Sequence, residues 1–378
     1  MSGSSPEEPV VWILLHDLAR TGVPIVLERL LRAAGRKDRV NVVAVHGGAV
    51  RRRLDGLTST CTVLEPDGRR SLTGAAAAGA AELGAPVVGG VVRRAAWRAR
   101  LRHLPDPDVV LVHGAGGWPI VASVRGAPPL VVHLHELELG LDRSIDPAEQ
   151  SAVFRRAVAV LAVSSPVADM AVRRGADPTR VELVPGVVEV PDPDEGSVRP
   201  VVAARCPPVM GAGTPGWRKA TDRVAAVAHE LARRGRPGSV GWVGGAPGGA
   251  DTRWVGAADA VRWYDEVDDP WTVMDGCEVV LVPSREDPLP LVALEAGLRS
   301  KAVVATPTGG LADLLAAGRG AVAPVHAVDW LAAATDRLLA HPGERAAMGS
   351  LLRAEVLARH DAAVVAPTWW SVLRSAAS

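Results

Sequence analysis

The stretch EVVLVPSREDPLPLVALEA, residues 278–296, contains the pattern that decides the fold. It begins with a short run of branched apolar residues, continues through a loop rich in proline and charge, and enters a helix near Leu291. A continuous apolar run is typical of a parallel strand that is buried on both faces. The stretch therefore predicts a strand, a loop and a helix in succession, which is the repeating unit of an α/β fold.

The same unit recurs along both halves of the chain. Short apolar runs alternate with longer stretches rich in alanine, leucine and arginine, and this rhythm predicts doubly wound, Rossmann-like parallel sheets. The runs expected to form strands are 10–15, 40–45, 109–112, 130–133, 158–163 and 181–184 in the first half, and 209–211, 239–243, 261–263, 278–282 and 302–305 in the second.

The chain has 378 residues, which exceeds what one hydrophobic core usually serves, so we expect two domains. The segment 190–197 is rich in proline and small polar residues, as linkers are. Residues 330–378 have helical character with a break at 341–343. We predict a first domain over 1–195, a second over 196–355 and a C-terminal helix over 356–378.

The composition favours a globular protein that does not bind nucleic acid. Hydrophobic residues make up 48% of the chain, and 42 basic residues balance 42 acidic ones, so no net positive field is available to gather a polyanion. Cys61, Cys206 and Cys277 are odd in number and lack metal-ligand spacing, which favours a reducing compartment. The start of the chain lacks the order of a secretion signal, and we expect a cytoplasmic protein.

Two loops of the first half follow predicted strands, where ligands of parallel sheets bind. Residues 16–24 include Thr21 and Gly22 ahead of a helix, and the loop is equally compatible with a binding loop or a structural turn. After the strand from Leu130, His135 and Glu136 offer groups for a sugar hydroxyl or a phosphate, with a structural role equally open. Zinc is disfavoured because His133 and His135 have no third ligand at a suitable spacing, and we expect no metal.

A glycine-rich loop at 211–219 follows a predicted strand of the second half and includes Thr214. It ends in Arg218 and Lys219, the side chains that suit a diphosphate, since arginine grips oxygens in a fork and lysine acts as a point charge. The chain contains only three lysines, at 37, 219 and 301, so a lysine here indicates a specific need. The alternative is a solvated surface pair.

Asp287 and Glu295 follow the predicted strand 278–282. One carboxylate in the loop and one a turn into the helix suit hydrogen bonds to sugar and ribose hydroxyls. The alternative for Glu295 is a position on the helix without function, but an acidic group among apolar neighbours is costly without a partner. Gly309 and Gly310, in a further loop between a strand and a helix, offer amides for phosphate oxygens.

Taken in order, these segments resemble glycosyltransferase family 4, retaining enzymes of the GT-B fold, over nearly the whole chain. The segments that carry the resemblance are 163–167, 181–187, 217–219, 284–288 and 295–296. In addition, residues 21–24 are similar to the Thr-Gly-Ala-Pro form of some bacterial members.

The resemblance implies two Rossmann-like domains that face each other across a cleft, with the donor held mainly by the second, the acceptor mainly by the first, and the last helices packed on the first. It places Arg218 and Lys219 at the donor phosphates, Asp287 at the donor sugar and His135 at the reaction centre, and these four form the expected catalytic set. Thr21 and Glu136 are expected on the acceptor side. The expected donor-binding residues are Gly22, Thr214, Glu286, Pro288, Leu289, Leu291, Val292, Glu295, Gly309 and Gly310.

Three positions depart from the family pattern. The first acid is Asp287 where glutamate is commoner, Ala220 follows the lysine where glycine is usual, and residues 300–302 read Ser-Lys-Ala where Gly-x-Pro is typical. These departures bear on the choice of donor sugar more than on the fold.

The expected activity is transfer of a hexose-type sugar from a UDP- or GDP-sugar to a hydroxyl of a glycan, lipid-linked or natural-product acceptor, with retention and without cofactor or metal. An alternative is a catalytically silent subunit that binds the sugar nucleotide and supports a partner enzyme. A nicotinamide-dependent oxidoreductase would need a Gly-x-Gly-x-x-Gly turn after the first strand, which residues 16–23 do not provide.

The arginine-rich run 93–102, with Trp97 inside it, has two interpretations. We favour a solvated helix face. The alternative is a basic amphipathic face for anionic lipid, which would place the protein in peripheral contact with the inner face of a membrane.

Overall fold

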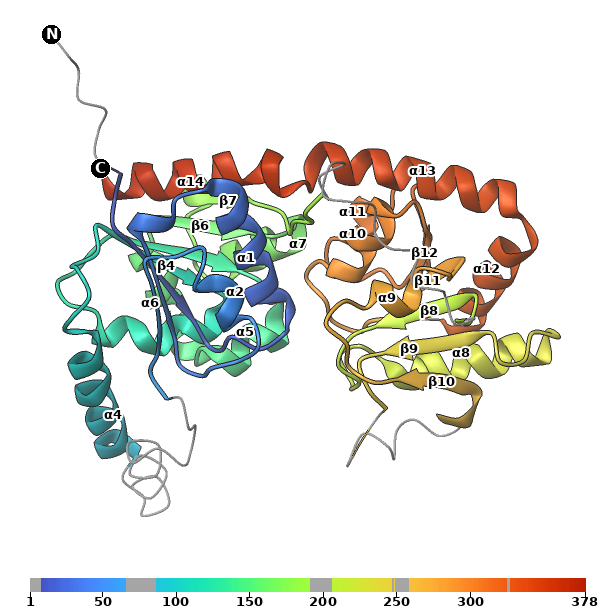
Figure 1. Ribbon diagram of the computed structural model, residues 1–378, viewed down its shortest axis with the longest axis horizontal. Coiled ribbons are helices and arrows are strands. Elements are labelled where there is room, and N and C mark those ends of the chain that lie inside the picture. Colours follow the sequence, from blue (N-terminus) through green and yellow to red (C-terminus); the bar gives the residue numbers. More distant parts are fainter. Residues whose placement is uncertain (1–7, 66–85, 191–205, 247, 249–257, 325–326) are drawn as a thin grey trace, which may run out of the picture. The chain divides into compact units, whose positions relative to one another are not determined.

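The computed structural model describes residues 8–65, 86–190, 206–246, 248, 258–324 and 327–378. The chain divides into two compact units, one formed by residues 1–185 and 362–378 and the other by residues 186–361 (Figure 1). The domain boundary expected at 195 and 196 lies outside the described residues.

The first unit contains a parallel sheet of seven strands in the order β3-β2-β1-β4-β5-β6-β7. Strand β3 was not predicted from the sequence, because its Thr-Cys-Thr-Val sequence at the edge of the sheet is not a continuous apolar run. The strands are β1 (Val11–Leu15), β2 (Val40–Ala44), β3 (Thr60–Val63), β4 (Val109–His113), β5 (Leu130–Leu134), β6 (Ala159–Ala162) and β7 (Val181–Leu183).

The C-terminal helix α14 (Ala362–Ala377) belongs to this first unit and packs against α1 (Gly22–Ala34) and the strands β4 and β5. Its Trp369 and Trp370 are buried, and Trp370 Nε1 donates to Glu8 Oε2 at 2.9 Å. The remaining helices of the unit are α2 (Arg51–Leu54), α4 (Pro86–Leu101), α5 (Glu138–Ser144), α6 (Pro147–Arg156) and α7 (Ser165–Arg173), with 3-10 turns at Lys37–Arg39, Ala115–Ser123 and Pro178–Arg180.

The second unit contains a parallel sheet of six strands in the order β10-β9-β8-β11-β12-β13. The strands are β8 (Val209–Ala212), β9 (Val240–Val243), β10 (Val261–Tyr264), β11 (Val279–Val282), β12 (Ala302–Ala305) and β13 (Ala321–Val322). Strand β13 was not predicted from the sequence, because its two residues are too few to form a pattern. Both parallel sheets confirm the predicted fold class.

Alternating side chains of the second sheet enter two separate cores. Val279 and Leu281 pack with residues of α8 and α12 on one face, whereas Val280 and Val282 pack with residues of α10, α11 and α13 on the other. This explains the continuous apolar run, because both faces of β11 are covered. The helices of the unit are α8 (Thr221–Arg233), α9 (Trp271–Met274), α10 (Leu291–Leu298), α11 (Leu311–Leu314), α12 (Val328–Ala340) and α13 (Pro342–Arg359), with a 3-10 turn at Ala258–Ala260.

The arginine-rich helix α4 has a buried tryptophan. Trp97 is only 2% exposed, and the guanidinium of Arg93 lies 5.1 Å from its ring centroid. The ring therefore does not belong to the exposed side of the helix, which includes Val88, Val91 and Arg94. Within the described residues, none of the helices has the length and hydropathy required to cross a bilayer.

Candidate active site

The strand order reverses at one point in each sheet, between β1 and β4 in the first unit and between β8 and β11 in the second. Loops that leave neighbouring strands at such a point diverge to opposite faces of the sheet and open a crevice beyond the strand ends. In the second unit these loops are 213–220, after β8, and 283–290, after β11. They contain four of the ten donor-binding residues predicted from the sequence, Thr214, Glu286, Pro288 and Leu289, together with Arg218, Lys219 and Asp287 of the expected catalytic set.

An ion pair joins the two loops. Lys219 Nζ donates to Asp287 Oδ2 at 2.6 Å, and the side chains are only 16% and 6% exposed. Arg218 Nη1 lies 3.7 Å from the same oxygen, and 47% of the Arg218 side chain is exposed. The structure thus brings together three of the four predicted catalytic residues, with two cations around one carboxylate.

A glycine makes room for the lysine. Gly213 has a φ of +135°, and a Cβ atom at this position would lie 3.0 Å from Lys219 Cε. The carbonyl oxygen of Gly213 accepts a hydrogen bond of 2.8 Å from Trp242 Nε1 of β9. The glycine-rich loop is therefore fixed against the sheet while Lys219 packs across it.

Arg285 ties the β11 loop to the β8 loop at a second place. Its guanidinium forms a fork with Asp222 of α8, with hydrogen bonds of 2.7 and 2.5 Å, and lies 5.6 Å from the ring centroid of Trp217. Its backbone amide donates to Arg218 O at 2.9 Å. A bidentate pair of this kind has fixed geometry, so it fixes the position of the Lys219 loop relative to the Asp287 loop.

The third loop of the site follows β12. Thr306 Oγ1 donates to Ser284 O at 2.6 Å, and the amide of Gly310 donates to Pro288 O at 2.8 Å. A Cβ atom at Gly309, whose φ is +51°, would overlap the carbonyl oxygen of Asp287. The Gly310 amide therefore donates to a carbonyl oxygen of the protein itself. Gly309 and Gly310 together support the loop that carries Asp287.

Glu295 accepts a hydrogen bond, as expected for an acidic side chain among apolar neighbours. It is half-buried on α10, and Trp271 Nε1 of α9 donates to its Oε2 at 3.2 Å. The guanidinium of Arg299 lies 4.9 Å from the Trp271 ring centroid. Trp271 was not predicted from the sequence, because 24 positions separate it from Glu295 and only the fold brings them together.

The apolar members of the predicted donor set contribute to packing. Val292 is buried in the core of the second unit, and Leu289 and Leu291 pack against that core. Thr214 is exposed and Glu286 is half-buried on their loops. The carbonyl oxygen of Glu286 accepts a hydrogen bond of 3.3 Å from Arg218 Nη1.

Two of the departures from the family pattern occupy left-handed backbone. Ala220 has a φ of +56° and Ser300 a φ of +55°. Glycine reaches this region without a steric penalty, whereas a residue with a Cβ atom does not. The backbone therefore keeps a conformation that suits glycine although the glycines are absent.

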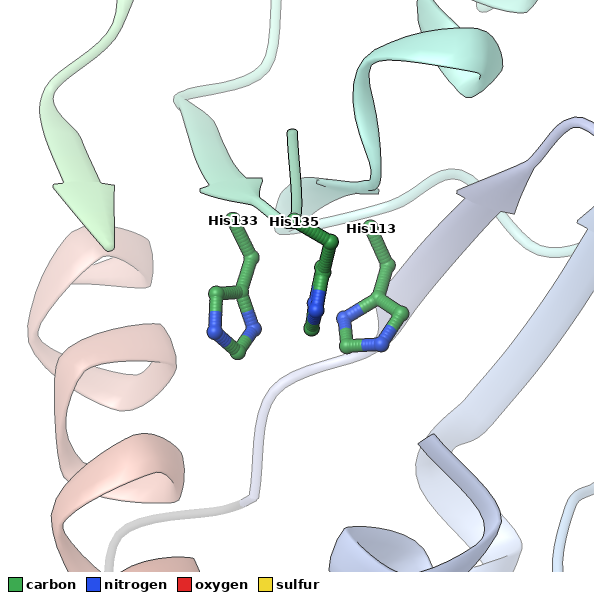
Figure 2. Close-up of side chains that lie close together, drawn as sticks. All are labelled: His113, His133 and His135. Atoms are coloured by element: carbon green, nitrogen blue, oxygen red, sulfur yellow. The ribbon is translucent and has the colours of Figure 1, made fainter. Parts of the chain in front are cut away.

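Three histidines gather at the ends of β4 and β5 in the first unit. His113 and His133 are register partners on the two strands, and His135 lies two positions beyond His133, so that side-chain alternation directs it to the same face. Figure 2 shows the ring of His135 between the other two, and the ring centroids are 4.3 to 4.9 Å apart. His113 was not predicted from the sequence, because its place beside His133 depends on the pairing of the strands.

The three histidine rings are held neutral by burial. Burial lowers the pKa of His133 to about 4, and burial together with the neighbouring rings lowers the pKa of His113 and His135 well below the usual value. His113 Nε2 lies 3.2 Å from Val23 O, and His133 Nε2 lies 3.3 Å from Val184 O.

The predicted loop residues of the first unit lie around these histidines. Glu136 Oε1 accepts from Ala115 N at 3.1 Å and its Oε2 accepts from His135 N at 2.9 Å. Thr21 and Gly22 are exposed at the start of α1, directly before the Val23 carbonyl that His113 contacts. The structure thus brings the first-strand loop and the His-x-His-Glu segment together.

Comparison with known families decides the identity. The family described as Glycosyltransferase Family 4 matches residues 20–190, and the family described as Glycosyl transferases group 1 matches residues 199–341. The chain belongs to the family 4 type of glycosyltransferases. A search of curated protein sequences gave no match.

Solved structures similar to this glycosyltransferase have the GT-B fold. HepE of Anabaena, in complex with UDP and glucose, is 18% identical with a TM-score of 0.73, and the match covers 97% of this chain and 100% of HepE. Sucrose-phosphate synthase of Thermosynechococcus elongatus is 18% identical with a TM-score of 0.70, covering 98% and 99% of the two chains. A glycosyltransferase of Rickettsia africae is 12% identical with a TM-score of 0.70, covering 98% and 99%. The GT-B fold predicted from the sequence is therefore confirmed.

Proposed function

We propose that this glycosyltransferase transfers a hexose from a nucleoside diphosphate sugar to an acceptor hydroxyl with retention of configuration. The observation that carries the proposal is the placement of Arg218 and Lys219 beside Asp287, where the strand order of the second sheet reverses. This arrangement offers two cations for a diphosphate and a carboxylate for a sugar hydroxyl.

The positive charges of the site suit the departure of the diphosphate, which is the difficult step of the proposed reaction. As the bond between the sugar and the diphosphate breaks, negative charge grows on the leaving phosphate oxygens. The exposed guanidinium of Arg218 can grip two of these oxygens, and Lys219 adds a point charge that Asp287 already holds in place. Groups oriented before the reaction lower its barrier because they need no rearrangement at the transition state.

Retention follows from attack on the face that the diphosphate leaves. In the proposed step the bond from the sugar C1 to the phosphate oxygen breaks, the bond from C1 to the acceptor oxygen forms, and the acceptor proton passes to the departing phosphate oxygen. We therefore assign no general base, metal or cofactor to the step. His135 is proposed to line the reaction centre, and Thr21 and Glu136 to face the acceptor.

UDP is the nucleotide that the comparisons favour, since HepE was solved with UDP-glucose. GDP is the second candidate. The proposed acceptor is a glycan, a lipid-linked sugar or a small natural product, and the proposed location is the cytoplasm, with the membrane face as a site of peripheral contact.

A donor panel tests the proposal. UDP- and GDP-hexoses are incubated with the protein, and both the release of nucleoside diphosphate and the anomeric configuration of the sugar product are measured. Lys219→Ala should reduce release by at least about tenfold, as expected when a transition-state contact of more than about 1.4 kcal/mol is lost. Lys37→Ala, which removes an exposed lysine of the first unit, is the matched control and should keep the wild-type rate.

The same panel tests the silent-subunit hypothesis. Binding of a donor without hydrolysis or transfer, and with equal signals from the wild type and Lys219→Ala, would replace the enzyme proposal by a binding role. An inverted product would retain the enzyme but overturn the proposed same-face attack.

A further inference from the structure

The three histidines of the first unit leave three ring nitrogens without a partner. His113 Nδ1, His133 Nδ1 and His135 Nε2 are buried and make no hydrogen bond. The residues offer one ligand atom each, and these atoms all lie within 4.8 Å of one another. We propose that His113, His133 and His135 bind one zinc ion.

The hydrogen bonds at the outer side of two rings fit this role. Val23 O lies beside His113 Nε2 and Val184 O beside His133 Nε2, and a carbonyl oxygen can only accept. Each Nε2 therefore carries the proton, and each Nδ1 presents a lone pair. Histidines that bind metals nearly always donate their second ring N–H to a carbonyl or a carboxylate in this way.

Without a cation the cluster is unfavourable. A buried acceptor that makes no hydrogen bond costs about 1–3 kcal/mol, and His113 Nδ1 and His133 Nδ1 are two such acceptors. The lone pairs of His113 Nδ1 and His133 Nδ1 are available to a metal ion, since the ring protons are on Nε2. Imidazole nitrogen is a preferred ligand of zinc.

The geometry requires only side-chain adjustment. Zinc–nitrogen bonds of about 2.0–2.1 Å in a tetrahedron place the nitrogens about 3.3 Å apart. His113 and His133 are register partners on adjacent strands, so their backbones are fixed by the sheet, and small ring rotations bring the nitrogens inward. His135, directly after β5, is the partly exposed member of the three, although its Nε2 is buried.

In the proposed site the fourth zinc ligand is a water molecule. Both carboxylate oxygens of Glu136, the nearest acidic side chain in the sequence, accept backbone amides and hold the loop after β5. Three histidines and one water form a complete tetrahedral site. The zinc proposal rests on residues of the first unit alone, and it assigns His135 to the reaction centre as a zinc ligand, because the same Nε2 cannot bind zinc and contact the sugar.

Zinc content tests the proposal directly. The full chain is treated with a chelator, dialysed against zinc and then against buffer, and analysed by elemental mass spectrometry. We expect about one zinc per chain in the wild type, and a rise in the unfolding temperature on zinc addition, because a ligand that binds only the native state stabilises it. Cobalt in place of zinc should give the visible absorption of a tetrahedral site.

Matched variants separate this site from other imidazoles. His113→Gln and His135→Gln should lose retained zinc and the shift in unfolding temperature, with circular dichroism confirming the fold. His135→Gln, at the partly exposed strand end, keeps the test usable if the replacement inside β4 unfolds the chain. His46→Gln, which removes one ring of the His16–His46 pair, should retain zinc. A folded wild type that releases all zinc on dialysis, or a folded His135→Gln protein that keeps it, overturns the proposal.

Discussion

Lys219 Nζ lies 2.6 Å from Asp287 Oδ2, although the two residues are 68 positions apart in the chain. The contact joins the loops that follow β8 and β11, and both side chains are largely buried. Each charged side chain therefore stabilises the other in its buried position and also holds it in place. The pair links the folding of the second unit to the proposed binding of the donor diphosphate.

Replacing Lys219 alone should destabilise the protein by about 2–3 kcal/mol, because it leaves the Asp287 carboxylate buried with only the more distant Arg218 nearby. The double variant Lys219→Met, Asp287→Leu should recover most of this loss, since it leaves no unpaired charge. Urea unfolding of the second unit measures both. Equal losses in the single and the double variant would show that the pair does not act as a unit.

Gly309→Ala should destabilise the second unit by more than about 2 kcal/mol and weaken donor binding. The added Cβ atom would overlap Asp287 O, and the positive φ adds backbone strain. Gly343→Ala is the matched control: it lies in the first turn of α13, no heavy atom lies within 4 Å of its added Cβ, and it should be neutral or slightly stabilising. Thermal unfolding and a donor titration distinguish the two, and a Gly309→Ala protein as stable as the Gly343→Ala protein would contradict the packing described.

Ser300→Gly should stabilise the protein by about 1 kcal/mol, because Ser300 is exposed and has a φ of +55°. Ala220→Gly should be closer to neutral, since the methyl group lost there is fully buried and its packing offsets the relief of strain. Ala354→Gly, at an exposed position within α13, should instead cost about 1 kcal/mol. Urea unfolding gives the three values, and the same sign for Ser300→Gly and Ala354→Gly would be inconsistent with a left-handed strain at Ser300.

Trp271→Phe should raise the KM for the donor severalfold and leave kcat nearly unchanged. The replacement keeps an aromatic ring but removes the Nε1 donor that orients Glu295, a carboxylate that we propose to bind a hydroxyl of the nucleotide ribose. Loss of a contact that binds donor and transition state equally changes KM alone. Trp263→Phe, against the other core of the same sheet, is the matched control and should leave KM unchanged. A drop in kcat with an unchanged KM would place Glu295 elsewhere in the reaction.

The sequence predicted the sheets of this protein well, because buried parallel strands leave continuous apolar runs such as that of β11. It failed at β3 and β13, an edge strand with polar residues and a strand of two residues. Residues within single loops, such as Arg218 and Asp287, could be predicted as site residues, since ligands of parallel sheets bind in the loops after the strands, and their function stays a prediction. Partners from distant segments could not: His113 beside His133 depends on strand register, and Trp271 beside Glu295 on helix packing.

His360 should make the stability of the second unit depend on pH. It lies at the end of α13, its Nδ1 is 2.9 Å from Gly186 O, and its carbonyl oxygen accepts from Val188 N at 2.8 Å. Burial lowers the pKa of His360 despite the opposing effects of the Gly186 carbonyl and Glu355. The folded protein therefore keeps the ring neutral at a pH at which the unfolded chain takes up a proton.

The sign of the effect follows from this difference. Above the unfolded pKa of about 6.5 neither state binds the proton, and the contribution of His360 to stability is fully present. As the pH falls through that value toward the lower folded pKa, the unfolded state gains a proton first and the free energy of unfolding decreases. Between pH 7 and pH 5, the free energy of unfolding of His360→Gln should therefore fall less steeply than that of the wild type. The control His341→Gln, which removes an exposed imidazole of the same unit, should keep the wild-type slope. Urea unfolding at a series of pH values measures the slopes, and identical slopes for all three proteins would mean that the burial of His360 does not govern the acid sensitivity of this unit.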